Sequence, residues 1–130
     1  MNLDKILGKN IEGFYLKKDS DFNIISMIIK IETVLLEVFV NEDTDTLKLK
    51  LISGDEETYI KEYVKINFFD KIFMGKKIIS YWKTQNHLGY FDVFLIGLDE
   101  FIPSISFSVI SSQIKIGILN YSEFETFSKN

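Results

Sequence analysis

Apolar and polar residues alternate along most of this chain with the two-residue period that is typical of β-strands. The alternation is clearest at 105–110, where large apolar side chains alternate with serines, and at 113–119, where isoleucines alternate with Lys115 and Gly117. Acidic, Asx-rich segments such as Asn41–Asp45 separate the runs, as turns do. The pattern predicts eight strands, over residues 10–17, 22–31, 34–40, 47–52, 77–84, 90–98, 105–110 and 113–119.

The period changes between Ser53 and Gly75. Tyr59, Ile60 and Tyr63 are spaced by three and four positions, which favours an amphipathic helix. We therefore predict one or two short helices between about Glu56 and Met74. The tail, residues 121–130, has no clear pattern, although its two phenylalanines are spaced as on a short helix.

Two stretches of the chain look alike. Residues 4–11 resemble residues 70–78 with one inserted residue, and each stretch has a glycine just before a strand. A glycine at that place supplies the left-handed conformation that ends many helices. We interpret the likeness as an internal repeat over 3–52 and 69–119, although a chance match in a chain rich in Lys and Ile is the other interpretation.

The predicted fold is mainly β (α+β), in one domain over residues 1–130. About eight antiparallel strands form two related four-stranded meanders, with one or two short helices between the halves. One meander alone leaves an apolar face exposed, and packing it on its twin removes that face from water. A sandwich and an open barrel both satisfy this requirement.

Composition narrows the classes of function. The chain has 130 residues, 46% of them hydrophobic, and no cysteine, so a disulfide framework and a thiolate metal site are excluded. It shows neither the apolar run of roughly 18 residues of a membrane helix nor a signal-peptide pattern, so we expect a cytoplasmic protein without a membrane partner. All 15 basic residues are lysines against 19 acidic residues, which argues against nucleic-acid binding.

No motif in the chain indicates catalysis. His87 is the single histidine, no Gly-x-Ser-x-Gly elbow is present, and the seven glycines are scattered singly. His87 paired with Asp92 is the one candidate for a catalytic base, but a lone histidine in a loop is usually only solvated. We expect no catalytic residue, no metal site and no cofactor.

The segment Trp82–Asp92 is the densest constellation of recognition residues in the sequence. We expect Trp82 and Tyr90 as anchors, with Asn86, His87 and Asp92 as polar contacts, and we expect Trp82 and Asp92 close together across a hairpin. The other interpretation is a structural turn, with Gly89 at positive φ and a carboxylate that bonds to loop amides.

Ten of the nineteen acidic residues lie between Asp19 and Glu57. Most of them are in predicted loops, so several are expected at one end of the sheet, where they would steer a basic partner. Ordinary solvation of loops is the alternative. The acidic candidates for partner contact are Asp19, Asp21, Glu42, Asp43, Asp45, Asp55, Glu56 and Glu57.

The second half resembles small uncharacterised bacterial domains with a Gly-Lys-x-Ile strand, a tryptophan and an Asn-x-x-Gly-Tyr-x-Asp turn. The likeness covers about half of the chain and implies no activity. Size, acidity and the lack of catalytic motifs are also similar to those of the immunity proteins that neutralise bacterial toxins. The matching residues are Gly75, Lys76, Ile78, Trp82, Asn86, Gly89, Tyr90 and Asp92.

The leading expectation is a non-enzymatic module that binds a protein partner, most concretely an immunity protein against a basic toxin. One alternative is a small-ligand-binding protein or enzyme with a pocket near the Trp82–Asp92 hairpin. A second alternative is a homodimeric structural module, because exposed strand edges invite self-pairing. The oligomeric state does not follow from the sequence.

Overall fold

The structure is a computed structural model, and it describes residues 1–54 and 56–119. Each predicted strand forms within two residues of its expected bounds, because the turns fall where the Asx-rich segments placed them. The elements in chain order are the 3-10 helix η1 (Leu3–Ile6), β1 (Ile11–Lys18), β2 (Ile24–Ile31), β3 (Val34–Asn41), β4 (Thr46–Ile52), α1 (Glu56–Ile60), β5 (Val64–Lys65), α2 (Asn67–Phe73), β6 (Ile78–Gln85), β7 (Phe91–Leu98), β8 (Ile105–Ile110) and β9 (Gln113–Ile118).

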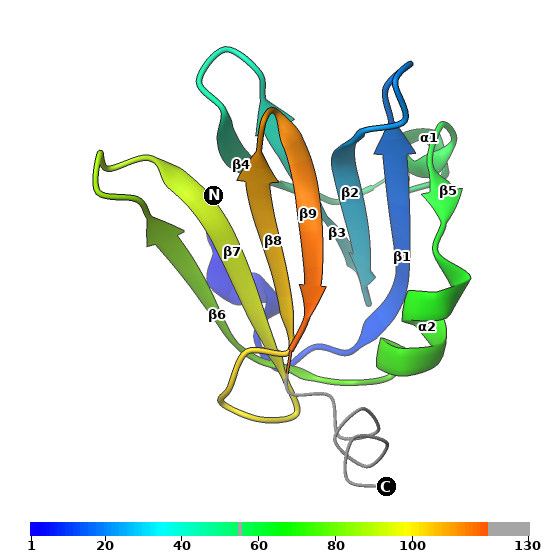
Figure 1. Cartoon of the computed structure of the whole chain (residues 1–130). Helices are drawn as coiled ribbons and strands as arrows, with labels where there is room; N and C mark the ends of the chain where they lie inside the picture. Colours follow the sequence, from blue (N-terminus) through cyan, green and yellow to red (C-terminus); the bar gives the residue numbers. More distant parts are fainter. Residues whose placement is uncertain (55, 120–130) are drawn as a thin grey trace, which may run out of the picture.

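Two antiparallel sheets face each other (Figure 1). The first sheet has the strand order β4-β3-β2-β1-β5, and the second has the order β6-β7-β8-β9. The mainly β prediction and its two meanders are confirmed, and the architecture is that of two sheets without a closed barrel. The strand that the sequence did not predict is β5, a two-residue strand that extends the first sheet beyond β1.

The core lies between the sheets, where their inward residues form one buried cluster. The alternation decides which residues enter it: Phe14, Met27 and Val38 point inward from the first sheet, as Phe94 and Phe107 do from the second. The helix α2 adds Phe69 and Phe73 to this cluster, and η1 adds Leu3 and Ile6. Within the described residues, no helix is long and apolar enough to cross a bilayer.

Strand pairing follows the same register in the two halves. Ile11 pairs with Ile31 in β1–β2, and Ile78 pairs with Leu98 in β6–β7, so both partners recur 67 positions further along the chain. The irregularities recur as well. A register shift after Ile11 is matched by one after Ile78, and a second shift, between Lys17 and Lys18, is matched by one between Thr84 and Gln85.

The two similar segments of the sequence pair with each other. Asn10 and Lys77 form an isolated antiparallel bridge. We call the paired segments 8–11 and 75–78 the seam. Gly8 N–H donates to the carbonyl of Ile78 over 2.8 Å, and Gly75 N–H donates to the carbonyl of Ile11 over 2.8 Å. The two hydrogen bonds are equivalent, because Gly75 and Ile78 lie 67 positions after Gly8 and Ile11.

Acidic side chains hold both strands of the seam in equivalent ways. Glu32 Oε2 accepts from the backbone N–H of Asn10 over 2.6 Å, and Asp99 Oδ1 accepts from that of Lys77 over 2.9 Å. Both acids follow the second strand of their half, and both have a positive φ, 45° for Glu32 and 61° for Asp99. These matches support the interpretation of an internal repeat.

One prediction from the sequence is wrong, and another concerns residues that the structure does not describe. Phe22 does not begin β2, because the hydrogen bonds of Asp19 extend the turn as far as Asn23. The short helix considered for the tail lies outside the described residues.

The glycines of the seam give a direct test of the fold. Gly75 has φ +83°, where a Cβ strains the backbone by about 1–2 kcal/mol. We expect Gly75→Ala to lower the free energy of unfolding by about that amount in urea denaturation. Gly13→Ala is the control, because its Cβ would meet the Tyr15 ring at an ordinary 3.5 Å, and it should change the value by less than about 0.5 kcal/mol. Equal losses in the two variants would contradict the role of the left-handed glycine.

Candidate functional site

Four hairpin turns lie at the same end of the sandwich, opposite the seam (Figure 1). We call this region the hairpin end and define it as residues 19–23, 41–45, 86–90 and 111–112. The β3–β4 turn reaches the β8–β9 turn directly, because Asp45 Oδ1 accepts from the backbone N–H of Ser112 over 2.7 Å. The predicted gathering of acidic loops thus has a geometric basis for Asp19, Asp21, Glu42, Asp43 and Asp45.

Side-chain oxygens fix the shape of these turns. Asp19 Oδ1 accepts from the backbone N–H groups of Asp21 and Asn23 over 2.8 and 3.0 Å. Asn86 Oδ1 does the same for Leu88 and Tyr90 over 2.9 and 3.2 Å. Such Asx turns substitute for missing backbone pairing, so the tips are held in defined conformations.

Large apolar side chains project from the tips of the turns. The exposed fraction is 80% for Phe22, 67% for Leu88, 53% for Ile110 at the end of β8, and 49% for Tyr90. Phe22 also has φ 64°, a conformation that bulky residues rarely adopt. An aromatic ring held in solvent on a strained backbone contributes nothing to the core, which makes Phe22 the strongest candidate anchor of this end.

Carboxylates lie in two of the four turns. The four turns contain five acidic residues, Asp19, Asp21, Glu42, Asp43 and Asp45, and no lysine. Asp19 and Asp45 are used in the hydrogen bonds described above. The carboxylates of Asp21, Glu42 and Asp43 make no hydrogen bond or ion pair with any described residue. They are therefore free to meet positive charge from outside.

The structure places the candidate residues of the Trp82–Asp92 segment in different surroundings. Trp82 pairs with Leu95 in the register of β6–β7, so the expectation that Trp82 and Asp92 lie close together is wrong, and about 10 Å of strand separates their positions. His87 and Tyr90 lie exposed in the turn, whereas Trp82 is half-buried in mid-strand on the outer face of the second sheet. Gly89 has the predicted positive φ of 86°, but the side chain that bonds to the loop amides is that of Asn86 and not that of Asp92.

The remaining acidic candidates lie away from the hairpin turns or outside the described residues. Glu57 is exposed on α1, which packs over the outer face of the first sheet through Ile60. Asp55 lies outside the described residues, as does the side chain of Glu56. The three residues that were predicted as one acidic run therefore share no described site with the turns.

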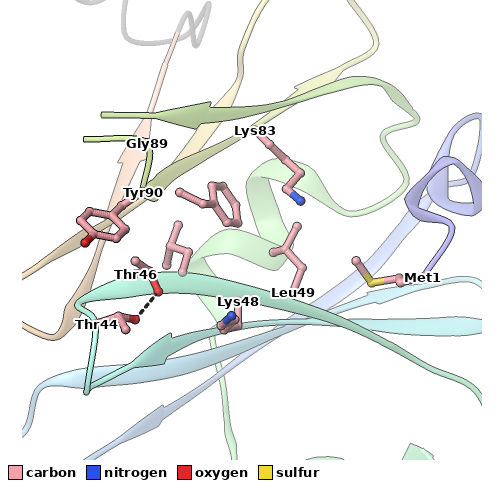
Figure 2. Close-up of a pocket in the computed structure, with 10 residues that line it drawn as sticks. Met1, Thr44, Thr46, Lys48, Leu49, Lys83, Gly89 and Tyr90 are labelled. Carbon is pink, nitrogen blue, oxygen red and sulfur yellow. Dashed lines mark hydrogen bonds between the residues drawn. The ribbon is translucent and has the colours of Figure 1, made fainter. Parts of the chain in front are cut away.

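A cleft of about 440 Å³ opens between the edge of the first sheet and the β6–β7 hairpin (Figure 2). Its wall combines apolar side chains with two lysines, and Lys83 extends from β6 into it, with its Nζ 5.0 Å from the centre of the Phe91 ring. Of the sequence candidates, only Tyr90 lines it. The lining residues are Met1, Thr44, Thr46, Leu47, Lys48, Leu49, Lys83, Gly89, Tyr90 and Phe91.

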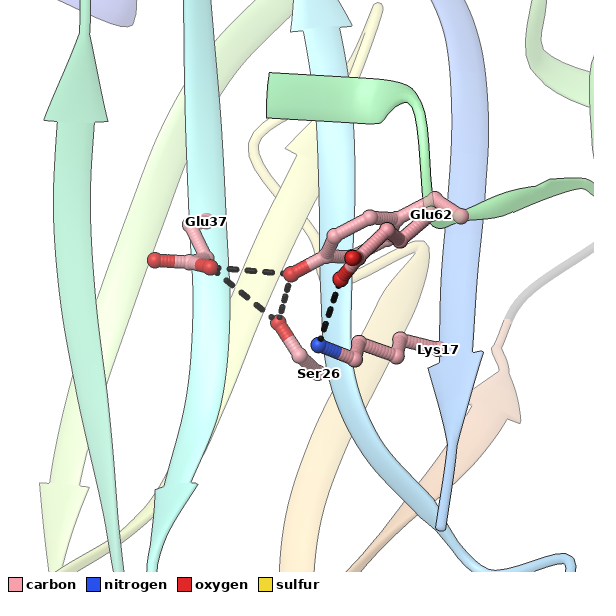
Figure 3. Close-up of polar contacts among 5 residues, drawn as sticks. Lys17, Ser26, Glu37 and Glu62 are labelled. Atoms are coloured by element: carbon pink, nitrogen blue, oxygen red, sulfur yellow. Dashed lines mark hydrogen bonds and ion pairs between the residues drawn. The ribbon is translucent and has the colours of Figure 1, made fainter. Parts of the chain in front are cut away.

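A polar cluster on the outer face of the first sheet joins α1–β5 to the strands beneath (Figure 3). The Tyr63 hydroxyl donates to Glu37 Oε2 over 2.9 Å and lies 2.7 Å from the hydroxyl of the buried Ser26. Lys17 Nζ pairs with Glu62 Oε2 at 3.3 Å beside it. Burial raises the pKa of Tyr63 to about 12, and the hydrogen bond and negative charge of Glu37 act in the same direction.

Sequence reasoning missed three groups of residues. Phe22 was assigned to a strand, the cluster of Ser26, Glu37 and Tyr63 joins segments that are distant in the chain, and Lys83 was not considered. A signal for Lys83 exists, since it stands two positions after Tyr81 and so belongs on the inward face of its strand. The described residues contain no group of three or more His, Asp or Glu side chains placed to hold a metal ion.

The chain belongs to a family of unknown function, DUF6334, whose model matches residues 1–123. Comparison with curated proteins and with solved structures finds no match. The family supports the expectation of an uncharacterised domain, and it adds no activity to the geometry described above.

The Tyr63 hydroxyl gives a test of the polar cluster. Tyr63 is neutral in both the folded and the unfolded chain below pH 10, and between pH 10 and 12 the unfolded chain ionises first. The stability that the neutral hydroxyl gives is therefore lost as the pH rises through this window. We expect Tyr63→Phe to remove a component near pH 12 from the absorbance titration of the tyrosines, and to lower the free energy of unfolding at pH 7 by about 1 kcal/mol.

Tyr59→Phe is the matched control for this experiment. The Tyr59 ring is exposed and lies under Lys50 Nζ, 5.8 Å from it, and no described residue bonds to its hydroxyl. Its replacement should leave both the component near pH 12 and the stability at pH 7 unchanged. A titration of Tyr63→Phe that matches that of the parent chain would refute the assignment.

Proposed function

We propose that this member of the DUF6334 family is a non-enzymatic protein-binding module, and more specifically an immunity protein that neutralises a basic bacterial toxin. The observation that carries the proposal is Phe22, which is 80% exposed at φ 64° in a turn that Asp19 holds rigid. The equivalent turn of the second half has Gly89 at φ 86°, so the turn sets the left-handed backbone at this position, but it requires neither a phenylalanine nor an exposed ring there.

The surroundings of Phe22 support a protein as the partner. Interfaces are built from a few apolar anchors within a polar rim, and the turn that carries Phe22 also carries the free carboxylate of Asp21. Rigid turns also reduce the entropy that is lost on binding. The hairpin end thus has both the anchors and the preorganisation that a docking surface needs.

The charge of the turns favours a basic partner. Five carboxylates and no lysine within the four turns attract positive charge, and this attraction speeds association at low salt. The opposite end of the sandwich has mixed charge, where Lys76 Nζ lies 3.8 Å from Asp99. Toxins that act on nucleic acid are often basic, and an acidic inhibitor without arginine complements them. A cytoplasmic site of action is part of this proposal.

The test is a titration of the purified chain with a basic protein encoded by a neighbouring gene, followed by calorimetry and stopped-flow kinetics. We expect saturable binding, with Phe22→Ser weakening affinity by at least about 30-fold, as an anchor residue does. Phe101→Ser is the matched control, because Phe101 is 78% exposed in the β7–β8 loop at the other end. Equal effects of the two substitutions would place the interface elsewhere.

The carboxylates are tested separately through kinetics. We expect the triple substitution Asp21→Asn, Glu42→Gln and Asp43→Asn to lower the association rate about tenfold at low salt and to remove most of its salt dependence. Glu100→Gln in the β7–β8 loop serves as the control and should leave the rate unchanged. Absence of any saturable binding to the neighbouring product would refute the toxin–immunity assignment.

A further inference from the structure

At one inward position the first half has an apolar residue and the second half has a charged residue. Leu16 of β1 packs against the core and pairs with Met27, and the residue 67 positions later is Lys83, which pairs with Phe94. Phe94 points into the core, as Met27 does. A lysine therefore stands on the inward face of β6 where the equivalent strand has a leucine.

The edge of the first sheet beside Leu16 and the edge of the second sheet beside Lys83 are also covered differently. We call these two edges of the sandwich its corners. Beyond β1, the strand β5 pairs with Leu16 through Val64, and Ile66 then packs against the core. Beyond β6 there is no further strand among the described residues, because β6 is the edge of its sheet. The corner at β6 remains open, and it forms the cleft of about 440 Å³ shown in Figure 2.

The cleft combines an apolar wall with the positive charge of Lys83. Leu47, Leu49 and Phe91 form the wall. No described carboxylate lies within ion-pair distance of Lys83 or Lys48. Lys83 is held over the Phe91 ring, which orients its ammonium group without neutralising it.

Two hydroxyls complete the polar part of the lining. Thr44 Oγ1 and Thr46 Oγ1 are 2.7 Å apart, so one donates to the other and the accepting hydroxyl keeps its own hydrogen. Thr46 is buried, which fixes the pair in place. A hydroxyl donor and the ammonium group of Lys83 are partners that suit an anionic group.

We propose that this cleft binds a small organic anion, in which an apolar chain lies along Leu47, Leu49 and Phe91 and a terminal carboxylate meets Lys83. Its volume is within the range of small-molecule sites, and its apolar lining with a few polar groups has their usual character. The proposal goes beyond the protein-binding function, which depends on the tips of the turns and not on Lys83.

Decanoate is the probe, used below its micelle concentration in calorimetry and in amide NMR of the whole chain. We expect saturable one-to-one binding, with shifts at residues 46–49, 83 and 89–91. Decan-1-ol and decyltrimethylammonium have the same chain without the negative charge, and each should bind at least about tenfold more weakly. Absence of saturable binding, or equal binding of the three probes, would overturn the proposal.

Substitutions separate the charge of Lys83 from its packing. Lys83→Met keeps most of the side-chain length and should weaken decanoate binding at least about tenfold. Lys115→Met, an exposed lysine on β9 that points away from the core, is the control and should leave the affinity unchanged. Lys83→Leu restores the residue of the matching strand, and we expect a melting temperature raised by about 2–6 °C together with lost binding. Unchanged affinity in Lys83→Met would refute the assignment.

Discussion

The pairing of residues 8–11 with 75–78 is the constraint on which the rest of the molecule depends. In these two short segments the chain passes from helix to strand in each half, and their mutual hydrogen bonds, 2.8–2.9 Å long, set where both sheets begin. Glu32 and Asp99 accept from the same two segments and so tie the far end of β2 and of β7 to the seam. Because the side-chain period of a strand is two residues, a slip of one residue here would turn the core faces of both sheets to solvent.

The helices act across the seam. Asp70 of α2 accepts from the backbone N–H of Phe14 over 3.0 Å, and Asp4 of η1 accepts from the hydroxyl of Tyr81 over 2.5 Å. Each helix thus contacts the first strand of the other half: α2 contacts β1, and η1 contacts β6. Neither half completes its core alone. The seven residues of α2, with Phe69 and Phe73, close one corner, while the four residues of η1 close less of the other. The cleft beside Lys83 lies at the corner where, among the described residues, no strand continues the sheet beyond β6.

The sequence predicted what local patterns encode. Alternation fixed the strands, and the likeness of residues 4–11 to 70–78 indicated that the two halves have the same form. Phe22 was placed in a strand because an apolar residue before Ile24 fits the alternation, and only the bonds of Asp19 across the turn exclude it. Trp82 and Asp92 were expected together because hairpin register depends on the turn, and a five-residue turn with a register shift at Gln85 moves Asp92 away from Trp82. Contacts between distant segments, such as Tyr63 with Ser26, have no local signal at all.

The candidate sites lie away from the seam. Residues at the seam must satisfy pairing in both halves, whereas the turns at the hairpin end need only their Asx bonds and leave their tips unconstrained. Phe22 is tolerated because it lies in a turn, and Lys83 is tolerated because it lies on an edge strand, where its side chain reaches solvent. The two halves share the pairing at the seam and the Asx turn of their first hairpin, and they differ in single side chains, with Phe22 in place of Gly89 and Leu16 in place of Lys83.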